Sequence, residues 1–566
     1  MRVLLKANNE PARAQPAPEG GAKGLLDAFA VADSPLVALV LLAGLPVLAA
    51  AWALLSPAHV LSRTMTWDLL FNLAGAWNLH FAHIPHVDFH EPVGQLNFLL
   101  TAAGFHFVGP SPRATLVGMT IVAAVLFAAA CFAAWRRLPL LPAAVFVLFC
   151  SLLVLMPANV GEAPNAYSFA MSYNRYCWST LCVLALILFL PPRNGRNGDV
   201  ADILIAGGLL LAMFYLKITY FVVGLAALAP ALALCPHVRA RWIGWTVMGL
   251  VVAANAVAPY NHAYLLDLWA VAQGGGVRDK LSLQLMQYFT NSAEPAIYVA
   301  GLAVAIWVWW RGYASLRLPV AAAYLIGSGA ALLSQNAQTG GIPPAMVVAF
   351  LLYDAIRQRF AGERFDGAMV ALLILLAFPI SYIGTSTLSL VAYHYNAGSE
   401  KAVRVVDRTN LKGLAVPVEE DGLLADFAAG NVGYPLLNRS RAVYSQFELS
   451  PFEYVETILE AADLLTGRRY PRGGVAVLDQ VNPLPFVLGW PPPRGENLWQ
   501  DPTKPVRPAE QFFAEVDYVL IPKFSTKSPS TKAITRAYMP YLNEHFRRVE
   551  ESPSWFLLSR GNRIDQ

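Results

Sequence analysis

The chain has 566 residues, of which 56% are hydrophobic and only 14% are charged. Soluble globular proteins carry about 25% charged residues, so this composition excludes an ordinary soluble protein and predicts many membrane-spanning helices. A formal net charge of +4 argues against a nucleic-acid partner. Five cysteines without a CxxC pair argue against a disulfide framework and a structural zinc site.

Hydrophobic runs divide the chain into three parts. Residues 1–34 are rich in Pro, Ala and Gly and predict a flexible cytoplasmic tail; 35–396 predict a transmembrane module and 397–566 an external domain. A bilayer crossing needs about 20 apolar residues. About eleven transmembrane helices are predicted, at 35–55, 115–135, 138–156, 176–191, 202–216, 218–235, 243–260, 296–310, 318–334, 342–356 and 368–393.

Basic residues decide the predicted orientation, because Lys and Arg gather on the cytoplasmic side of a membrane. Clusters such as Arg136 with Arg137 all face the cytoplasm only if segment 202–235 crosses twice as a tight hairpin. The N-terminus is then cytoplasmic, and the odd number of crossings puts the C-terminal domain outside. The external loops are then 56–114, 157–175, 259–295 and 335–341.

The first external loop, 56–114, is too long for a plain connection. Its apolar spacing predicts two amphipathic helices along the outer leaflet, at 66–82 and 95–108. Ionisable groups beside lipid are costly, so a cluster of them predicts a functional site. The clustered residues are Asp68, His80, His83, His86, Asp88, His90 and Glu91.

The order of motifs in this loop is specific. Asp68 is followed by His83-Ile-Pro-His-Val-Asp88-Phe, by Pro92-Val-Gly-Gln-Leu and by Val108-Gly-Pro-Ser-Pro-Arg113. This order resembles the first external loop of the GT-C fold superfamily of membrane glycosyltransferases, which includes protein O-mannosyltransferases, the lipid A aminoarabinose transferase and mycobacterial arabinosyltransferases. Here His83-Ile-Pro-His86 replaces the usual Gly-x-Pro-Tyr. The resemblance implies a polyprenyl-phosphate sugar donor presented at the outer face and an acceptor hydroxyl activated by the loop aspartate.

Sugar transfer needs a base for the acceptor's proton and cations near the departing phosphate. Asp68 is the candidate base, Asp88 the second carboxylate that orients the acceptor or holds a metal, and Glu91 a weaker third. His86, Asp88 and His90 would share one side of an extended strand, where they could ligate a divalent cation such as Mg²⁺ or Mn²⁺. Some members of the superfamily use such a cation and others do not. The alternative for each residue is a solvated loop side chain.

Two basic residues are candidates for the donor phosphate. Lys217, in Phe214-Tyr-Leu-Lys-Ile-Thr-Tyr220, stands at the predicted outer tip of the hairpin and suits a lipid phosphate. The alternative is a lysine that snorkels to the interface. Arg175, at the outer start of another span, could pair with the phosphate or with Glu162, or anchor its helix at the interface. Tyr220, His86 and Glu91 join them as substrate-binding candidates.

The C-terminal part, 397–566, alternates strand-like and helix-like pieces, which predicts a layered α/β domain. It contains no nucleophile elbow, Walker loop or dinucleotide fingerprint. Trp490 and Trp499 are candidates to stack on the sugar rings of an acceptor; the alternative is that their loops pack the domain onto the membrane module. Strands are predicted at 411–417, 474–479, 517–522 and 555–559, and helices at 450–466 and 530–547.

These features predict a hexosyl- or pentosyltransferase that moves a sugar from a polyprenyl-phosphate donor to a glycan, lipid or other acceptor hydroxyl. The expected setting is polysaccharide synthesis in the cell envelope, with the site on the periplasmic face of a bacterial inner membrane. Two other classes stay open. A lipid-linked sugar transporter or flippase would favour repeats and mid-membrane charges. A membrane-anchored glycan-binding or assembly protein would place its function in the external domain.

Overall fold

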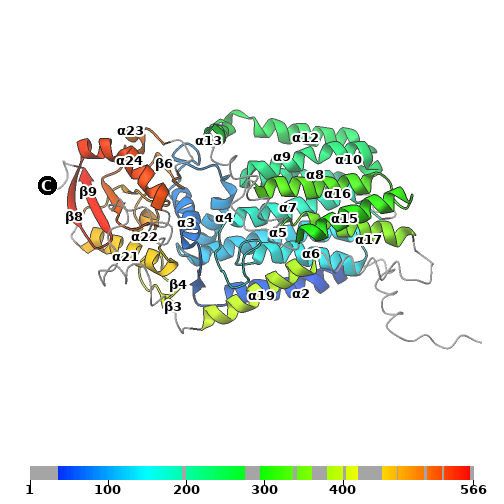
Figure 1. Cartoon of the computed structure of the whole chain (residues 1–566), viewed down its shortest axis with the longest axis horizontal. Helices are drawn as coiled ribbons and strands as arrows, with labels where there is room; N and C mark the ends of the chain where they lie inside the picture. The colour runs from blue at the N-terminus through cyan, green and yellow to red at the C-terminus, as the bar shows by residue number, and fades with distance from the viewer. Residues whose placement is uncertain are drawn as a thin grey trace, which may run out of the picture.

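The structure is a computed structural model with a long bundle of helices and a smaller α/β part at one end of it (Figure 1). The C-terminal residues belong to the α/β part. The residues that the structure describes are 36–193, 199–273, 294–334, 341–359, 379–399, 403–418, 449–467, 470–501, 506–525 and 528–560.

Helices of the bundle overlap every predicted span, although the first part of the last span, 368–393, lies outside the described residues. The bundle helices are α2 (Leu36–Leu55), α5 (Arg113–Arg137), α6 (Leu140–Leu155), α7 (Ser172–Phe189), α8 (Asp199–Leu216), α9 (Ile218–Ala226), α10 (Leu228–Leu234), α11 (Pro236–Arg239), α12 (Trp242–Ala256), α13 (His262–Gln273), α15 (Glu294–Trp310), α16 (Arg317–Ser334), α17 (Ala345–Arg359) and α19 (Ile380–Gly398).

Three bundle helices, α2, α5 and α16, are long and apolar enough to cross a membrane within the described residues. The pair formed by α12 and the helical segment 259–273 passes the same test as one span with a bend of 52°. Shorter apolar helices surround them. The chain is therefore an integral membrane protein, while the number of eleven crossings stays a prediction.

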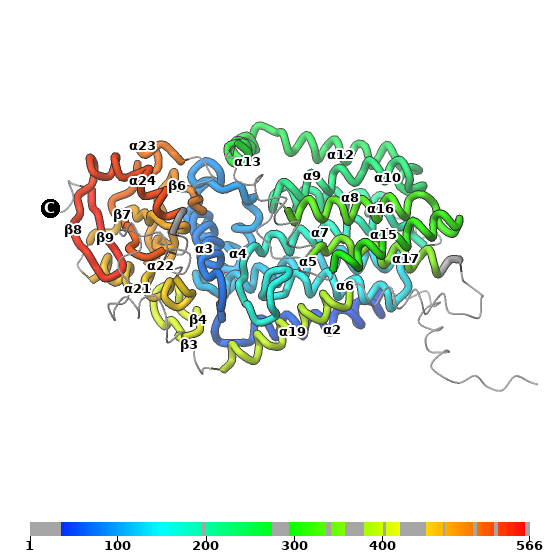
Figure 2. Tube along the Cα trace, viewed as in Figure 1, coloured from blue at the N-terminus to red at the C-terminus, as the bar shows by residue number. Residues whose placement is uncertain are grey.

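The predicted hairpin is present between α8 and α9. Lys217 is extended and separates the two helices. A Cβ atom on Gly224 would lie 2.6 Å from the Met213 side chain and 3.0 Å from that of Leu210, so the helices run side by side in opposite directions. Figure 2 shows α8 and α9 among the helices of the bundle. The turn between them lies against the first loop, because the Gly94 amide donates to the carbonyl oxygen of Leu216, the residue before Lys217, at 3.0 Å.

The C-terminal end of α5 contains a buried cluster of charged side chains. Arg136 and Arg137, in the last turn of α5, each place a guanidinium nitrogen 2.7 Å from Oδ2 of Asp202 on α8. The three side chains are almost fully buried. The sequence predicted that Arg136 and Arg137 lie in a cytoplasmic loop. In the structure they lie in the last turn of α5, and both guanidinium groups pair with Asp202 in the first turn of α8.

The first loop folds into the two predicted helices, α3 (Thr66–His80) and α4 (Leu96–Val108). A Cβ atom on Gly75 would lie 2.2 Å from the ring of Phe98, so glycine lets α3 and α4 pack in direct contact. Two short strands, β1 (Val60–Leu61) and β2 (Phe89–His90), flank α3.

The α/β part contains every strand and both helices predicted for it. A four-stranded sheet has the order β5-β7-β9-β8, in which β5 and β7 are parallel and the other neighbours are antiparallel. The predicted helix 530–547 ends two residues early, because Phe546 begins β8. The elements are β3 (Val403–Val405), β4 (Leu414–Pro417), α21 (Pro451–Gly467), β5 (Val475–Val477), α22 (Leu484–Leu488), β6 (Glu496–Asn497), α23 (Ala509–Phe512), β7 (Tyr518–Pro522), α24 (Ser528–His545), β8 (Phe546–Glu551) and β9 (Trp555–Arg560).

Strands of the first loop pair with strands of the C-terminal part. β1 is parallel to β4 and β2 is parallel to β6. The indole nitrogen of Trp77 donates to the carbonyl oxygen of Trp490 at 2.8 Å. Trp490 is buried, and Trp499 packs edge to face on Phe71 at 5.7 Å between ring centroids. These tryptophans therefore hold the two parts together, and the prediction that they stack on sugars is wrong for the buried Trp490.

Glu496 lies at this junction with a protonated carboxyl group at neutral pH. Burial raises its pKa from 4.5 to about 8, against the hydrogen bonds from Asn482 and Asn78. The folded protein therefore keeps a proton that the unfolded chain loses above pH 4.5, and the free energy of unfolding falls as pH rises from 4.5 to 8.

Replacing Glu496 with glutamine should remove this pH dependence. We expect Glu496→Gln to raise the free energy of unfolding above pH 8 by roughly 3–5 kcal/mol, since one pKa unit corresponds to about 1.4 kcal/mol. Denaturant titrations of the purified protein at pH 5 and pH 9 measure the free energy of unfolding. The exposed residue Glu510 supplies the control, Glu510→Gln, which should leave the free energy of unfolding unchanged at both pH values. Equal stability of Glu496→Gln and the parent chain at pH 9 would contradict a protonated Glu496.

Candidate functional site

Asp68 lies in the first turn of α3, where the chain enters the helix through a left-handed residue, Met65, at φ 50°. The Asp68 amide donates to the Met65 carbonyl oxygen at 2.8 Å. The Asp68 side chain is partly exposed, and its carboxyl group makes no hydrogen bond or ion pair with any residue that the structure describes. An acid held at a fixed place without a structural partner is available for chemistry.

The surroundings of Asp68 raise its proton affinity. Burial among protein atoms, followed by the charges of Glu162 and Glu91, raises the pKa of Asp68 from 3.8 to about 7. Each cause disfavours the ionised form, so the carboxylate gains proton affinity. A general base works best with a pKa near the working pH. Asp68 therefore has the proton affinity that the sequence-based role requires.

Glu91 connects the first loop to the hairpin. It is buried, and its charge acts on both Asp68 and Lys217. The loop that carries it lies directly on α8: the Gly94 amide donates to the Leu216 carbonyl oxygen at 3.0 Å. A Cβ atom at residue 94 would lie 2.1 Å from the carbonyl oxygen of Tyr215, so only glycine allows this approach.

Lys217 faces the same region. Its Nζ donates to Oδ1 of Asn174 at 3.1 Å and lies 5.1 Å from the centre of the Tyr173 ring. Tyr173 in turn lies within electrostatic range of both Asp68 and Glu91. The structure therefore brings Asp68, Glu91 and Lys217 together around Tyr173.

Tyr220 and Arg175 lie deeper. The Tyr220 ring is fully buried and packs on Trp178 with 4.8 Å between ring centroids. Arg175 is also fully buried, and its Nη1 donates to the carbonyl oxygen of Ala170 at 3.1 Å. Its Nε and Nη2 atoms find no hydrogen-bond partner among the described residues. Arg175 is thus no exposed interface anchor, and its buried donors suit an anion.

The predicted metal ligands are not assembled. His86 has a left-handed backbone at φ 66°, and β2 begins only at Phe89, so residues 86, 88 and 90 do not alternate along one strand. Asp88 Oδ2 accepts from the Ile84 amide at 2.7 Å, and Oδ1 lies 3.4 Å from Nε of Arg494. No group of three or more His, Cys, Asp or Glu side chains in the described part of the chain could hold a metal ion. The proposed ligand set therefore does not fit a divalent cation.

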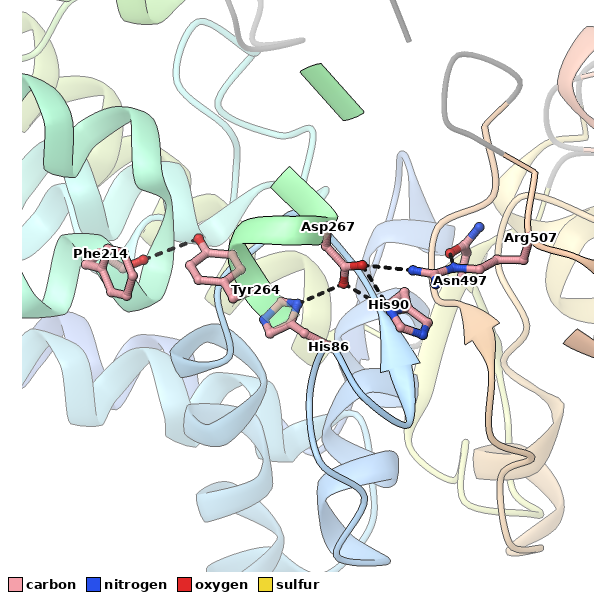
Figure 3. Close-up of polar contacts among 7 residues, drawn as sticks. All are labelled: His86, His90, Phe214, Tyr264, Asp267, Asn497 and Arg507. Carbon is pink, nitrogen blue, oxygen red and sulfur yellow. Dashed lines mark hydrogen bonds and ion pairs between the residues drawn. The ribbon is translucent and has the colours of Figure 1, made fainter. Parts of the chain in front are cut away.

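His86 and His90 converge instead on Asp267 of α13 (Figure 3). His86 Nδ1 donates to Asp267 Oδ2 at 3.1 Å, and His90 Nδ1 donates to Oδ1 at 3.0 Å. The Arg507 Nη2 atom donates to Oδ1 at 2.8 Å. The sequence analysis placed residue 267 in the external loop 259–295 and assigned it no role. It gave no signal for Arg507 either, because 240 residues separate Asp267 from Arg507 and their contact cannot be read from local sequence.

No protein-family model and no curated protein matches the sequence. Among solved structures, the chain is similar to the crystal structure of ArnT from Cupriavidus metallidurans bound to undecaprenyl phosphate. The match covers 93% of this chain and 98% of that chain, with 12% sequence identity and a TM-score of 0.41.

Proposed function

We propose that this protein is a GT-C-type membrane glycosyltransferase, which transfers a hexosyl or pentosyl group from a polyprenyl-phosphate donor to an acceptor hydroxyl. The observation that carries the proposal is Asp68, which has no partner among the described residues and a pKa raised to about 7, beside the Glu91–Lys217 region. Helices long and apolar enough to cross a membrane support a lipid-linked donor. The proposed setting is the periplasmic face of a bacterial inner membrane.

In the proposed reaction, the Asp68 carboxylate takes the proton of the acceptor hydroxyl as its oxygen forms a bond to the anomeric carbon. The bond between that carbon and the phosphate oxygen breaks, and the polyprenyl phosphate leaves with the electron pair. Lys217 and Arg175 are cations that stabilise the negative charge on the departing phosphate. Glu91 keeps the pKa of Asp68 high through its charge. Asp88 positions the loop through Ile84 and Arg494.

Loss of the Lys217 ammonium group should weaken binding of the lipid phosphate. A hydrogen bond to a charged group contributes about 1.5–3 kcal/mol, so Lys217→Ala should raise the Kd for polyprenyl phosphate by roughly 10–100-fold. Titration of radiolabelled undecaprenyl phosphate into the chain in nanodiscs measures this. The exposed Lys412 gives the matched control, Lys412→Ala, with an expected Kd equal to that of the parent chain. Unchanged affinity in Lys217→Ala would remove the phosphate role of this lysine.

A further inference from the structure

A pocket of about 280 Å³ opens where the first loop, α13 and the C-terminal part meet. Pockets for small ligands start at about 300 Å³, so this pocket has room for a ligand of about one sugar residue. The first loop contributes His90, Glu91 and Pro92. α13 contributes one side of the wall, and the C-terminal part contributes Asn497, Val506, Arg507 and Pro508.

The polar groups of this pocket are held in fixed positions. Asp267 accepts hydrogen bonds from His90 and Arg507, and the Arg507 Nε atom donates to Oδ1 of Asn497 at 3.3 Å (Figure 3). His86 donates to the same carboxylate, and its ring contacts that of Tyr264 in a tilted arrangement with 4.5 Å between ring centroids. Carboxylate, amide and guanidinium groups in a rigid array match the hydroxyl groups of a sugar, which both donate and accept.

The remaining wall of the pocket is apolar. It is formed by Leu266, Ala270 and Val271 of α13 together with Pro92, Val506 and Pro508. Aliphatic and proline side chains pack against the C–H face of a sugar ring, whereas a densely charged ligand would leave them unused. Since Asp267 and Glu91 oppose Arg507 in charge, the lining carries no strong excess of one sign. These features favour a neutral sugar residue.

Glu91 connects the pocket to the proposed reaction centre. It lines the pocket, and its charge acts on Asp68. Lys217 lies on the hairpin of the bundle, whereas Asn497 and Arg507 belong to the C-terminal part. A ligand in the pocket would therefore approach Asp68 from the side of the C-terminal part, and the donor phosphate would approach from the side of the hairpin.

We infer that this pocket binds a neutral hexose or pentose residue of the acceptor glycan, with Asp267, Asn497 and Arg507 as hydroxyl-binding groups. The acceptor role rests on the proposed function, whereas sugar binding by the pocket does not. The assignment also gives the His86–His90–Asp267–Arg507 cluster a role: it fixes the position of the pocket's carboxylate and guanidinium groups.

Binding of simple glycosides tests the inference directly. Saturation-transfer NMR on the purified full chain, with methyl mannoside, glucoside, galactoside and arabinoside as probes, should detect millimolar binding of at least one of them. Val506→Trp should weaken that binding by at least about tenfold, because an indole ring fills part of the pocket. Val418→Trp is the matched control, since Val418 is a similarly exposed valine outside the pocket lining, and should bind as the parent chain does.

Two results would overturn the inference: no probe binds, or Val506→Trp binds as well as Val418→Trp. A separate measurement distinguishes the failure of the proposed function. Lys217→Ala should retain glycoside binding while its affinity for undecaprenyl phosphate falls. Glycoside binding that depends on the pocket, in a chain that shows no affinity for undecaprenyl phosphate and no transfer from its sugar derivatives, would reject the transferase and retain the sugar site.

Discussion

Replacing Asp68 with asparagine is expected to reduce the rate of sugar transfer by roughly 10²–10⁴-fold, the usual contribution of a general base. Asparagine has nearly the same volume but cannot accept the proton of the acceptor hydroxyl. Because the Asp68 carboxyl makes no hydrogen bond or ion pair with the described residues, its substitution leaves no structural contact broken. Transfer from a radiolabelled polyprenyl-phosphate sugar, in nanodiscs, measures the rate, and Asp407→Asn, at an exposed position, is the control.

The pH dependence of the same assay gives an independent readout. The ionised form of Asp68 is the active one, so the rate should rise as pH increases and reach half of its plateau near pH 7. The charge of Glu91 contributes to the raised pKa, and Glu91→Gln should therefore move this midpoint to lower pH. A rate that survives in Asp68→Asn, or a flat profile between pH 5 and pH 9, would reject Asp68 as the base.

Replacing Asp202 with asparagine is expected to lower the free energy of unfolding by about 3–5 kcal/mol, the usual cost of breaking a buried ion pair. The substitution removes the negative charge that lies 2.7 Å from a guanidinium nitrogen of both Arg136 and Arg137. Both guanidinium groups then lose this ion pair at a place where they are almost fully buried.

An exposed ion pair supplies the comparison for Asp202. Asp463 pairs with Arg408, and both side chains are about half exposed. Such pairs contribute about 0–1 kcal/mol, so Asp463→Asn should leave the stability almost unchanged. SDS titration of both variants, followed by far-ultraviolet circular dichroism, measures the difference. Equal stability of the two variants would show that the buried cluster does not hold α5 to α8.

The helices of the first loop and the hairpin at Lys217 were predictable because each depends on local information. The spacing of apolar residues marks α3 and α4, and a single lysine in a long apolar run marks the turn between α8 and α9. Asp68, Glu91 and Lys217 became candidates for the same reason: a charge in an apolar setting stands out in the sequence.

The sequence failed where the outcome depends on distant partners. The alternation of His86, Asp88 and His90 suggested one set of ligands, but a left-handed residue at 86 and the pairing of Asp88 with Arg494 separate them. Asp267, the group on which both histidines converge, lies in another segment of the chain. Trp490 is of a residue type that often stacks on sugars. Only the packing of the C-terminal part onto Trp77 shows that Trp490 is buried.

The pairing of β1 with β4 and of β2 with β6 has a consequence for biosynthesis. Trp77 and Trp490, which join the same two parts, are 413 residues apart, so the first loop is translated long before its partner segments exist. Contacts of such long range form late, since the intervening chain must first be closed into a loop. During synthesis the first loop would therefore lack its partner strand β6, and the pocket would lack Asn497 and Arg507, until about the last hundred residues leave the ribosome. A product terminated before residue 496 would lack this side of the pocket and the strand that pairs with β2.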